Sequence, residues 1–218
     1  MRQHNAVHKF FSMKKRAMHV REFFLHNINP VIRFLVISDV LIVGAAGLFA
    51  PVFALFIAES VQGDETVAGI AAGLYLLSKS ILQIPCAHYL DKIRGERDDF
   101  WFMFIFSLLA AIFPIFYIFV STPLELYLVQ LLLGFCIAFT YPSFMAIFTR
   151  HVDKHKEGTE WSIYFTLIDI VSALLAIIGG YLAYLAGFAT LIIVVVIVSV
   201  LGVLLLLPIR PYLKKGKR

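Results

Sequence analysis

Charged residues are scarce in this chain. Asp, Glu, Lys and Arg together make up 15% of its 218 residues, whereas apolar residues make up 61%. Soluble domains usually contain about 25% charged residues, because water must solvate most of their surface. The shortage excludes an ordinary soluble domain and indicates that lipid surrounds most of the chain.

The sequence also lacks the alternation of apolar and polar residues that lipid-facing barrel strands show over about ten residues. It contains instead six apolar runs, each close to or above the ~20 residues that a helix needs to cross a bilayer. Because backbone groups inside lipid must hydrogen-bond within their own segment, these runs predict helices. We therefore expect an all-α membrane protein with a transmembrane domain at 31–209, whose six helices lie at 31–58, 66–89, 100–120, 124–149, 161–186 and 188–207.

Lysine and arginine are absent from one set of connections between these runs, at 59–65, 121–123 and 187. They are concentrated in the N-terminal segment 1–30, in the loops after the second and fourth runs, and in the tail 210–218. Connections rich in Lys and Arg stay in the cytoplasm. This sorting predicts a multi-pass protein of the plasma (inner) membrane with both termini in the cytoplasm. It also explains the net charge of +5 without a nucleic-acid partner.

A cleavable signal and a disulfide framework are both missing. The first 30 residues lack the short apolar core and small-residue cleavage site of a secretory signal. Their basic residues are interleaved with aromatic ones such as Phe10 and Phe23, which favours an amphipathic helix lying on membrane lipids. A basic tail that only sets the topology is the alternative. Cys86 and Cys136 fall inside apolar runs, which predicts two buried free thiols.

Few ionisable residues lie deep inside the apolar runs. Asp39, Lys79 and Asp169 each lie about 12–14 Å from the cytoplasmic end of their helix, at a rise of ~1.5 Å per residue. A charge near the bilayer centre costs at least about 2.5 kcal/mol, so these residues are expected to face the protein interior and to pair. Lys79 can neutralise one aspartate, which leaves the second protonated, paired elsewhere or hydrated, and therefore a candidate proton-binding group. The group predicts an ion or substrate site or, in the alternative, a structural tie between three helices.

The remaining polar residues suit binding better than catalysis. Gln130 and Tyr141 belong to a polar side of the fourth run, where they could bind solute hydroxyls or hydrogen-bond between helices. Membrane serine proteases need a histidine at depth, but His88, His151 and His155 fall at loops or helix ends. The acidic cluster after the second run lacks the Asp-x-x-Asp-Gly pattern of head-group transferases. We therefore expect no enzyme, no cofactor and no metal.

The loop after the second run holds the most specific motif in the chain. It reads Ala-His-Tyr-Leu-Asp-Lys-Ile-Arg-Gly-Glu-Arg over 87–97. It resembles the Gly-x-x-x-Asp-Arg/Lys-x-Gly-Arg/Lys loop of the major facilitator superfamily. Asp91 and Lys92 match that pattern, whereas Ala87 replaces the first glycine and Gly95 comes one residue late, with Arg94 in its place.

Other motifs extend the resemblance to one six-helix repeat of that superfamily, over 31–218. Tyr141-Pro142 and Lys156-Glu157-Gly158 look like the first half of its members. Two departures bear on mechanism. Gln130 stands where many proton-coupled members carry an arginine, and Leu175-Ala176 replaces the Gly-Pro of the drug-antiporter motif. The usual arginine relay and an antiporter assignment are therefore not supported. Asp39, Lys79 and Asp169 are the remaining candidates for proton coupling.

The resemblance implies a mechanism. Members alternate access by rocking two six-helix halves about a midplane site, so one six-helix chain is expected to work as a parallel homodimer. We expect a secondary active transporter of a small organic solute, linked to protons. One half of a heterodimer, a piece of a twelve-helix protein and a non-transporting scaffold or receptor are the alternatives. The solute and the direction of transport stay open, because a cation, a sugar and a zwitterion all suit two aspartates and a lysine.

The family loop also implies a conformational latch, formed by Asp91, Lys92, Arg94 and Arg97. In family members the loop aspartate lies by the cytoplasmic start of a helix in the other half. Here that helix is the partner's fifth, whose N-terminus near Trp161 carries a partial positive charge that favours a carboxylate. We expect Asp91 of one protomer to hold the cytoplasmic side closed. The alternative is that it only caps its own loop.

Overall fold

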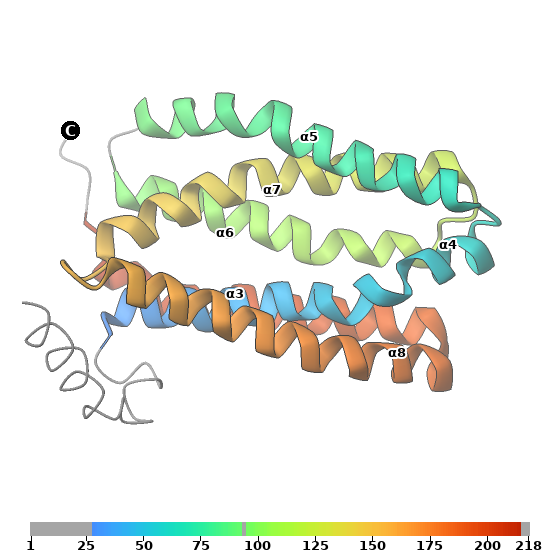
Figure 1. Ribbon diagram of the computed structural model, residues 1–218. Coiled ribbons are helices and arrows are strands. Elements are labelled where there is room, and N and C mark those ends of the chain that lie inside the picture. The colour runs from blue at the N-terminus through green and yellow to red at the C-terminus, as the bar shows by residue number, and fades with distance from the viewer. Residues whose placement is uncertain (1–27, 93–94, 215–218) are drawn as a thin grey trace, which may run out of the picture.

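The computed structural model describes residues 28–92 and 95–214. It is a bundle of long helices that lie side by side (Figure 1). The N-terminal segment 1–30, in which an interfacial helix is expected, is described only from residue 28, and the latch residue Arg94 lies outside the described residues. The elements in chain order are α3 (Pro30–Phe49), η1 (Ala50–Val52), α4 (Phe53–Ser60), α5 (Glu65–Lys92), α6 (Glu96–Ile112), η2 (Phe113–Ile118), α7 (Pro123–His151), α8 (Glu157–Leu204) and η3 (Leu207–Tyr212).

Two helices begin at capping residues that are visible in the sequence. Asn29 precedes α3, and its side-chain oxygen accepts a hydrogen bond from the Val31 backbone N–H at 3.0 Å. Thr122 precedes α7 and forms a capping box with Glu125, whose carboxylate accepts from the Thr122 N–H at 3.1 Å. A proline occupies the first position of both helices, where its missing N–H would have had no partner.

Helical segments that are long and apolar enough to cross a membrane number five in the described part of the chain: Pro30–Ser60, Glu65–Lys92, Glu96–Ile118, Pro123–His151 and Glu157–Tyr212. They match the first four expected spans and the last two combined. Helical hydrogen bonding continues past the apolar part of a run, so α5 ends at Lys92 instead of 89 and α6 begins at Glu96 instead of 100.

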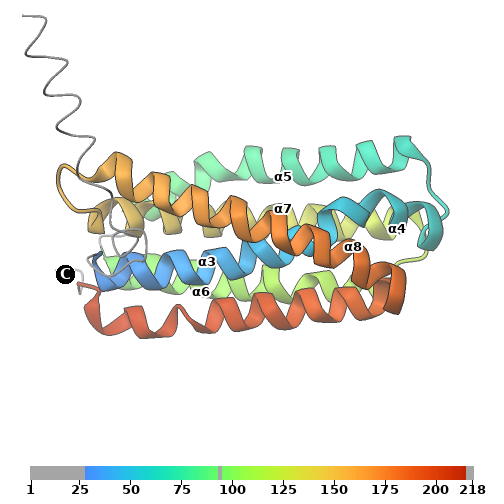
Figure 2. The same cartoon turned by 60° about the horizontal axis from the view of Figure 1, so that its bottom comes forward.

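Gly187 divides α8 into two arms, 157–186 and 188–204. Its backbone is non-helical, with φ 78° and ψ 169°. Glycine adopts a positive φ readily because it has no Cβ atom. Figure 2 shows the ribbon turning back at the end of the orange arm and returning as the red arm. The two arms coincide with the fifth and sixth expected spans, and six crossings follow if each arm crosses by itself.

Glycine allows the helices to pair closely. α3 packs on α8, and α5 packs on α7. A Cβ atom on Gly179 would lie 1.9 Å from the backbone oxygen of Leu48, and one on Gly134 would lie 2.5 Å from that of Tyr75. Backbones can approach to this extent only where a side chain is missing. These two glycines therefore set the spacing within both helix pairs.

Two apolar clusters form the core, one toward each end of the bundle. Leu35 and Phe148 belong to the first, and Leu48 and Phe56 belong to the second. The described ends of the chain meet at the first cluster, where α3 begins and where η3 ends (Figure 1). Cys86 and Cys136 are buried and free, as the sequence predicts.

Candidate functional site

A hydrogen bond inside the bundle joins α3 to the first arm of α8. The phenol of Tyr164 donates to Oδ2 of Asp39, with 2.6 Å between the oxygens. Tyr164 is buried and Asp39 is half-buried. Sequence reasoning missed this partner of Asp39. The two residues lie at similar depth, but nothing in the local sequence shows that their helices face each other. The carboxylate is thus held by a neutral donor.

The structure brings together two of the predicted site residues, Lys79 and Tyr141. The ammonium of Lys79, on α5, lies 5.2 Å from the centre of the Tyr141 ring, on α7. A cation over an aromatic face at this distance is attracted by the negative charge of the ring face. In the described part of the chain, no carboxylate oxygen lies within 4.0 Å of the Lys79 ammonium. An aromatic ring therefore replaces the expected aspartate beside this lysine.

Asp169 lies apart from both contacts. It is exposed on the first arm of α8. Among the described residues it has neither an ion-pair partner nor a side-chain hydrogen bond. Asp39, Lys79 and Asp169 therefore form no ion pair or side-chain hydrogen bond with one another within the single chain, and a site that contains all three stays a prediction.

A cavity of about 440 Å³ lies between α3, α5, α6, α7 and the second arm of α8. Its wall is mostly apolar and includes Phe49 and Phe53. Four polar side chains from four elements also line it: Tyr75, Tyr117, Gln130 and Ser199. Gln130 is 7% exposed, and it is the predicted site residue that reaches this cavity. Among the described residues, none of these four side chains has a hydrogen-bond partner in the protein.

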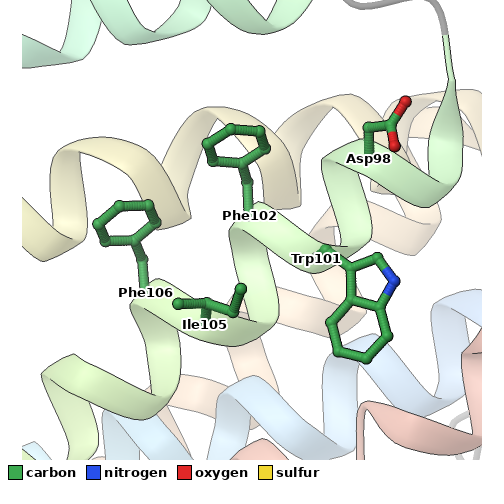
Figure 3. A pocket seen from close by; sticks show the side chains of 5 residues that line it. All are labelled: Asp98, Trp101, Phe102, Ile105 and Phe106. Atoms are coloured by element: carbon green, nitrogen blue, oxygen red, sulfur yellow. The ribbon is translucent and has the colours of Figure 1, made fainter.

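A second hollow, of about 420 Å³, lies on one side of α6 (Figure 3). Asp98, Trp101, Phe102, Ile105 and Phe106 line it, and all five come from this one helix. Phe102 and Phe106 point to one side of the helix and Trp101 points to another, so the side chains do not converge on a common point. We regard it as a surface hollow, because no second element closes it.

An ionic contact ties α6 to α7 at the end of the bundle where the described chain ends meet. The Asp99 side chain is 2% exposed and forms an ion pair with Arg150, which is 41% exposed. Glu96 extends this contact, because its carboxylate lies 4.0 Å from the His151 ring and accepts the Lys214 N–H at 2.8 Å. Sequence reasoning noted the acidic residues here but not their basic partners on the next helix.

The latch residues lie beside this contact. Asp91 and Lys92 are exposed at the end of α5, and Arg97 is half-buried in the first turn of α6. The exposure of Asp91 leaves it accessible to a second six-helix half, and the latch stays a prediction. Within the described ranges, no group of three or more His, Cys, Asp or Glu residues is placed to hold a metal ion.

The family model described as Major Facilitator Superfamily matches residues 35–218, which is most of the chain. No curated protein matches the sequence.

Proposed function

Because the chain belongs to the major facilitator superfamily, we propose that it is a secondary active transporter that moves a small organic solute across the plasma (inner) membrane. We also propose that the chain crosses the membrane six times, with the two arms of α8 as the fifth and sixth crossings. The proposal also places the described chain ends in the cytoplasm. The Lys- and Arg-rich connections lie at that end of the bundle, which supports this orientation.

The exposed carboxylate of Asp169 is the observation that carries the proposal. Asp169 lies well inside an apolar helix, yet in the described part of the chain nothing pairs with it. A carboxylate that faces lipid near the bilayer centre costs at least about 2.5 kcal/mol. This face of α8 is therefore better suited to a second protein half and a hydrated cavity than to lipid.

The second half that we propose is another copy of this chain. A parallel homodimer with a two-fold axis along the membrane normal has the same symmetry as the two halves of family members. Rocking of the copies against each other would expose the cavity between them first to one side and then to the other. Asp39, Lys79 and Asp169 would then occur twice around that cavity.

Proton linkage is part of the same proposal. Asp39 is held by the Tyr164 phenol and not by a basic group, so its carboxylate can take up a proton without breaking an ion pair. Gain and loss of this proton would couple the movement of the solute to the proton gradient.

The first test is the mass of the full chain in nanodiscs, measured by native mass spectrometry. The expected result is a complex of two identical chains. A second, non-identical six-helix chain in the complex would contradict the homodimer and support a heterodimer. A persistent monomer would contradict both and would favour a scaffold or receptor, or a chain that requires further covalent sequence.

The second test measures transport itself. The purified protein is reconstituted in liposomes, and solute-induced currents are recorded across a library of neutral and charged organic solutes under an inward proton gradient. The expected result is a current for at least one solute that disappears when the gradient is collapsed. Asp169→Asn should reduce this current, whereas Asp64→Asn, in a connection outside the helices, should not.

A further inference from the structure

The cavity between α3, α5, α6, α7 and the second arm of α8 has a mostly apolar wall with a few polar side chains, and this wall limits which ligands can bind. We infer that this cavity binds an uncharged, mostly apolar solute that carries a hydrogen-bonding group. This cavity lies inside one chain and is distinct from the cavity that the proposed function places between two copies. Its ligand is therefore a further one, and its binding does not depend on the proposed function.

The absence of charge in the wall excludes ionic solutes. No Asp, Glu, Lys, Arg or His is among the described residues that line the cavity. Transfer of an ionised group from water into such a wall costs several kcal/mol or more unless a counter-charge is present. The Asp39 carboxylate and the Lys79 ammonium do not line the cavity and contact Tyr164 and Tyr141 instead. The solute site and the candidate proton site are therefore separate.

Four polar side chains are available to a ligand. Tyr75, Tyr117, Gln130 and Ser199 have no hydrogen-bond partner in the described protein. Their polar atoms are accessible from the cavity, because the buried side-chain atoms without a partner in the described residues belong to Arg97, Glu160 and Ser172. A polar group on a solute can therefore replace the water that would otherwise hydrate them. A hydroxyl, phenol, indole N–H or amide on the solute could satisfy one or two of them.

Two of these groups are held in place by the packing of α5 on α7. Gln130 and Gly134 are four residues apart on α7, so they share one face of the helix. The backbone of α5 at Tyr75 passes so close to Gly134 that a Cβ atom there would lie 2.5 Å from the Tyr75 oxygen. This contact fixes the distance between the helices that carry Tyr75 and Gln130.

Tyr117 is positioned by aromatic rings. Its ring centre lies 5.5 Å from that of Phe49, 6.0 Å from that of Phe53 and 5.8 Å from that of Phe56. Contacts at these distances stabilise the ring beyond the area that it buries. The phenol is thus held by neighbours that are themselves apolar, and two of these rings, Phe49 and Phe53, form part of the wall against which a flat apolar solute can pack.

The volume of the cavity limits the size of the solute. About 440 Å³ lies in the lower part of the range of roughly 300–1,000 Å³ that is usual for small-molecule sites. A compact molecule with one or two rings fits this volume. A sugar does not suit it, because several hydroxyls would be buried against apolar walls without partners.

Three matched probes test the inference: 2-naphthol, which has the expected chemistry, naphthalene, which lacks the polar group, and 2-naphthoate, which carries a charge. Saturable binding of tritiated 2-naphthol to the full chain in nanodiscs is measured after subtraction of empty nanodiscs. We expect one site per chain, weaker competition by naphthalene, and no competition by 2-naphthoate or glucose at neutral pH. Failure of 2-naphthol to bind saturably, or equal competition by 2-naphthoate, would overturn the inference.

Variants place the binding in this cavity. Gln130→Leu or Tyr117→Phe should weaken 2-naphthol binding about fivefold, the effect of one lost hydrogen bond, and leave naphthalene competition unchanged. Ala46→Phe should block binding, because Ala46 is exposed and lines the cavity, whereas Ala54→Phe on α4 serves as the exposed control outside it. Unchanged binding in Ala46→Phe would overturn the inference.

Two outcomes distinguish this inference from the proposed function. If 2-naphthol binds as expected but no solute is transported in liposomes, only the proposed function is refuted. If a charged solute is transported but 2-naphthol does not bind, only this inference is refuted.

Discussion

Tyr164 donates a 2.6 Å hydrogen bond to the Asp39 carboxylate across the interface between α3 and α8. This contact connects an ionisable residue of the first helix with a buried tyrosine more than a hundred positions later in the chain. It makes Asp39 the one predicted carboxylate with a defined protein partner in the described residues, because Asp169 has none.

Removal of this hydrogen bond should lower stability in a way that depends on both residues. Tyr164→Phe should reduce the free energy of unfolding by about 1–2 kcal/mol, because it leaves the half-buried Asp39 carboxylate without its donor. A double-mutant cycle with Asp39→Ala, which removes the acceptor, followed by SDS-induced unfolding, measures the coupling between the two side chains. Tyr184→Phe, at an exposed position near Gly187, is the control and should have little effect. Additive effects of the Asp39 and Tyr164 changes would show that the contact does not stabilise the protein.

Proton coupling through Asp39 should separate two kinds of transport. Asp39→Asn removes the group that gains and loses the proton, so uphill accumulation of the solute should stop while exchange of solute across the membrane continues. Accumulation and counterflow are measured in liposomes at several pH values. The same test applies to Asp169→Asn. A pH dependence like that of the wild type in both variants would eliminate these carboxylates as the coupling groups.

The loop carboxylate Asp91 should control which side of the transporter is open. It is exposed at the end of α5, where a second half could place the start of its α8 against it. Asp91→Asn removes the charge that the helix N-terminus favours, so the population should shift toward the inward-facing state. Accessibility labelling of single cysteines on the two sides measures this shift. Asp98→Asn, at an exposed residue in the first turn of α6, is the control, and equal labelling in the wild type and Asp91→Asn would contradict the latch.

Two neighbouring glycines on α8 should respond in opposite ways to alanine. Gly179→Ala places a Cβ atom 1.9 Å from the Leu48 backbone oxygen, so α3 and α8 must move apart, with an expected loss of at least about 2 kcal/mol of stability. Gly180 has nothing within 4 Å of the added atom, so Gly180→Ala should be neutral or stabilise by up to about 1 kcal/mol through higher helix propensity. Thermal unfolding of the two variants in the same detergent provides the comparison. Equal shifts would mean that the close approach at Gly179 does not determine the packing.

The ion pair between Asp99 and Arg150 should contribute more to stability than the exposed pair on the following loop. Arg150→Ala leaves the almost fully buried Asp99 carboxylate without its partner, with an expected cost of about 1–3 kcal/mol. Lys156 and Asp153 form a 3.0 Å pair whose side chains are both exposed, so Lys156→Ala should cost less than about 1 kcal/mol. Urea or SDS titration in low and high salt distinguishes the two, because salt should weaken the pair with two exposed side chains more than the pair that contains the buried Asp99.

The sequence by itself was sufficient to predict the helices and their order. Length and apolarity are local properties. They predict the five described segments that are long enough to cross a membrane, and the reversal at Gly187. The capping residues before α3 and α7 are equally local, because a cap satisfies backbone groups only a few residues away. The family loop at 87–97 is also a local pattern of residues. The family match over 35–218 confirms the resemblance that this loop predicts.

Tertiary structure alone decided which of the polar residues meet. Asp39 contacts Tyr164, Lys79 lies over Tyr141, and Gln130 lines a separate cavity. Depth in the membrane can be counted from the sequence, but the direction in which a helix turns its polar side depends on the helix packed against it. That packing is set by close contacts between distant residues, such as Gly179 against Leu48, which leave no periodic signal in the sequence of either helix.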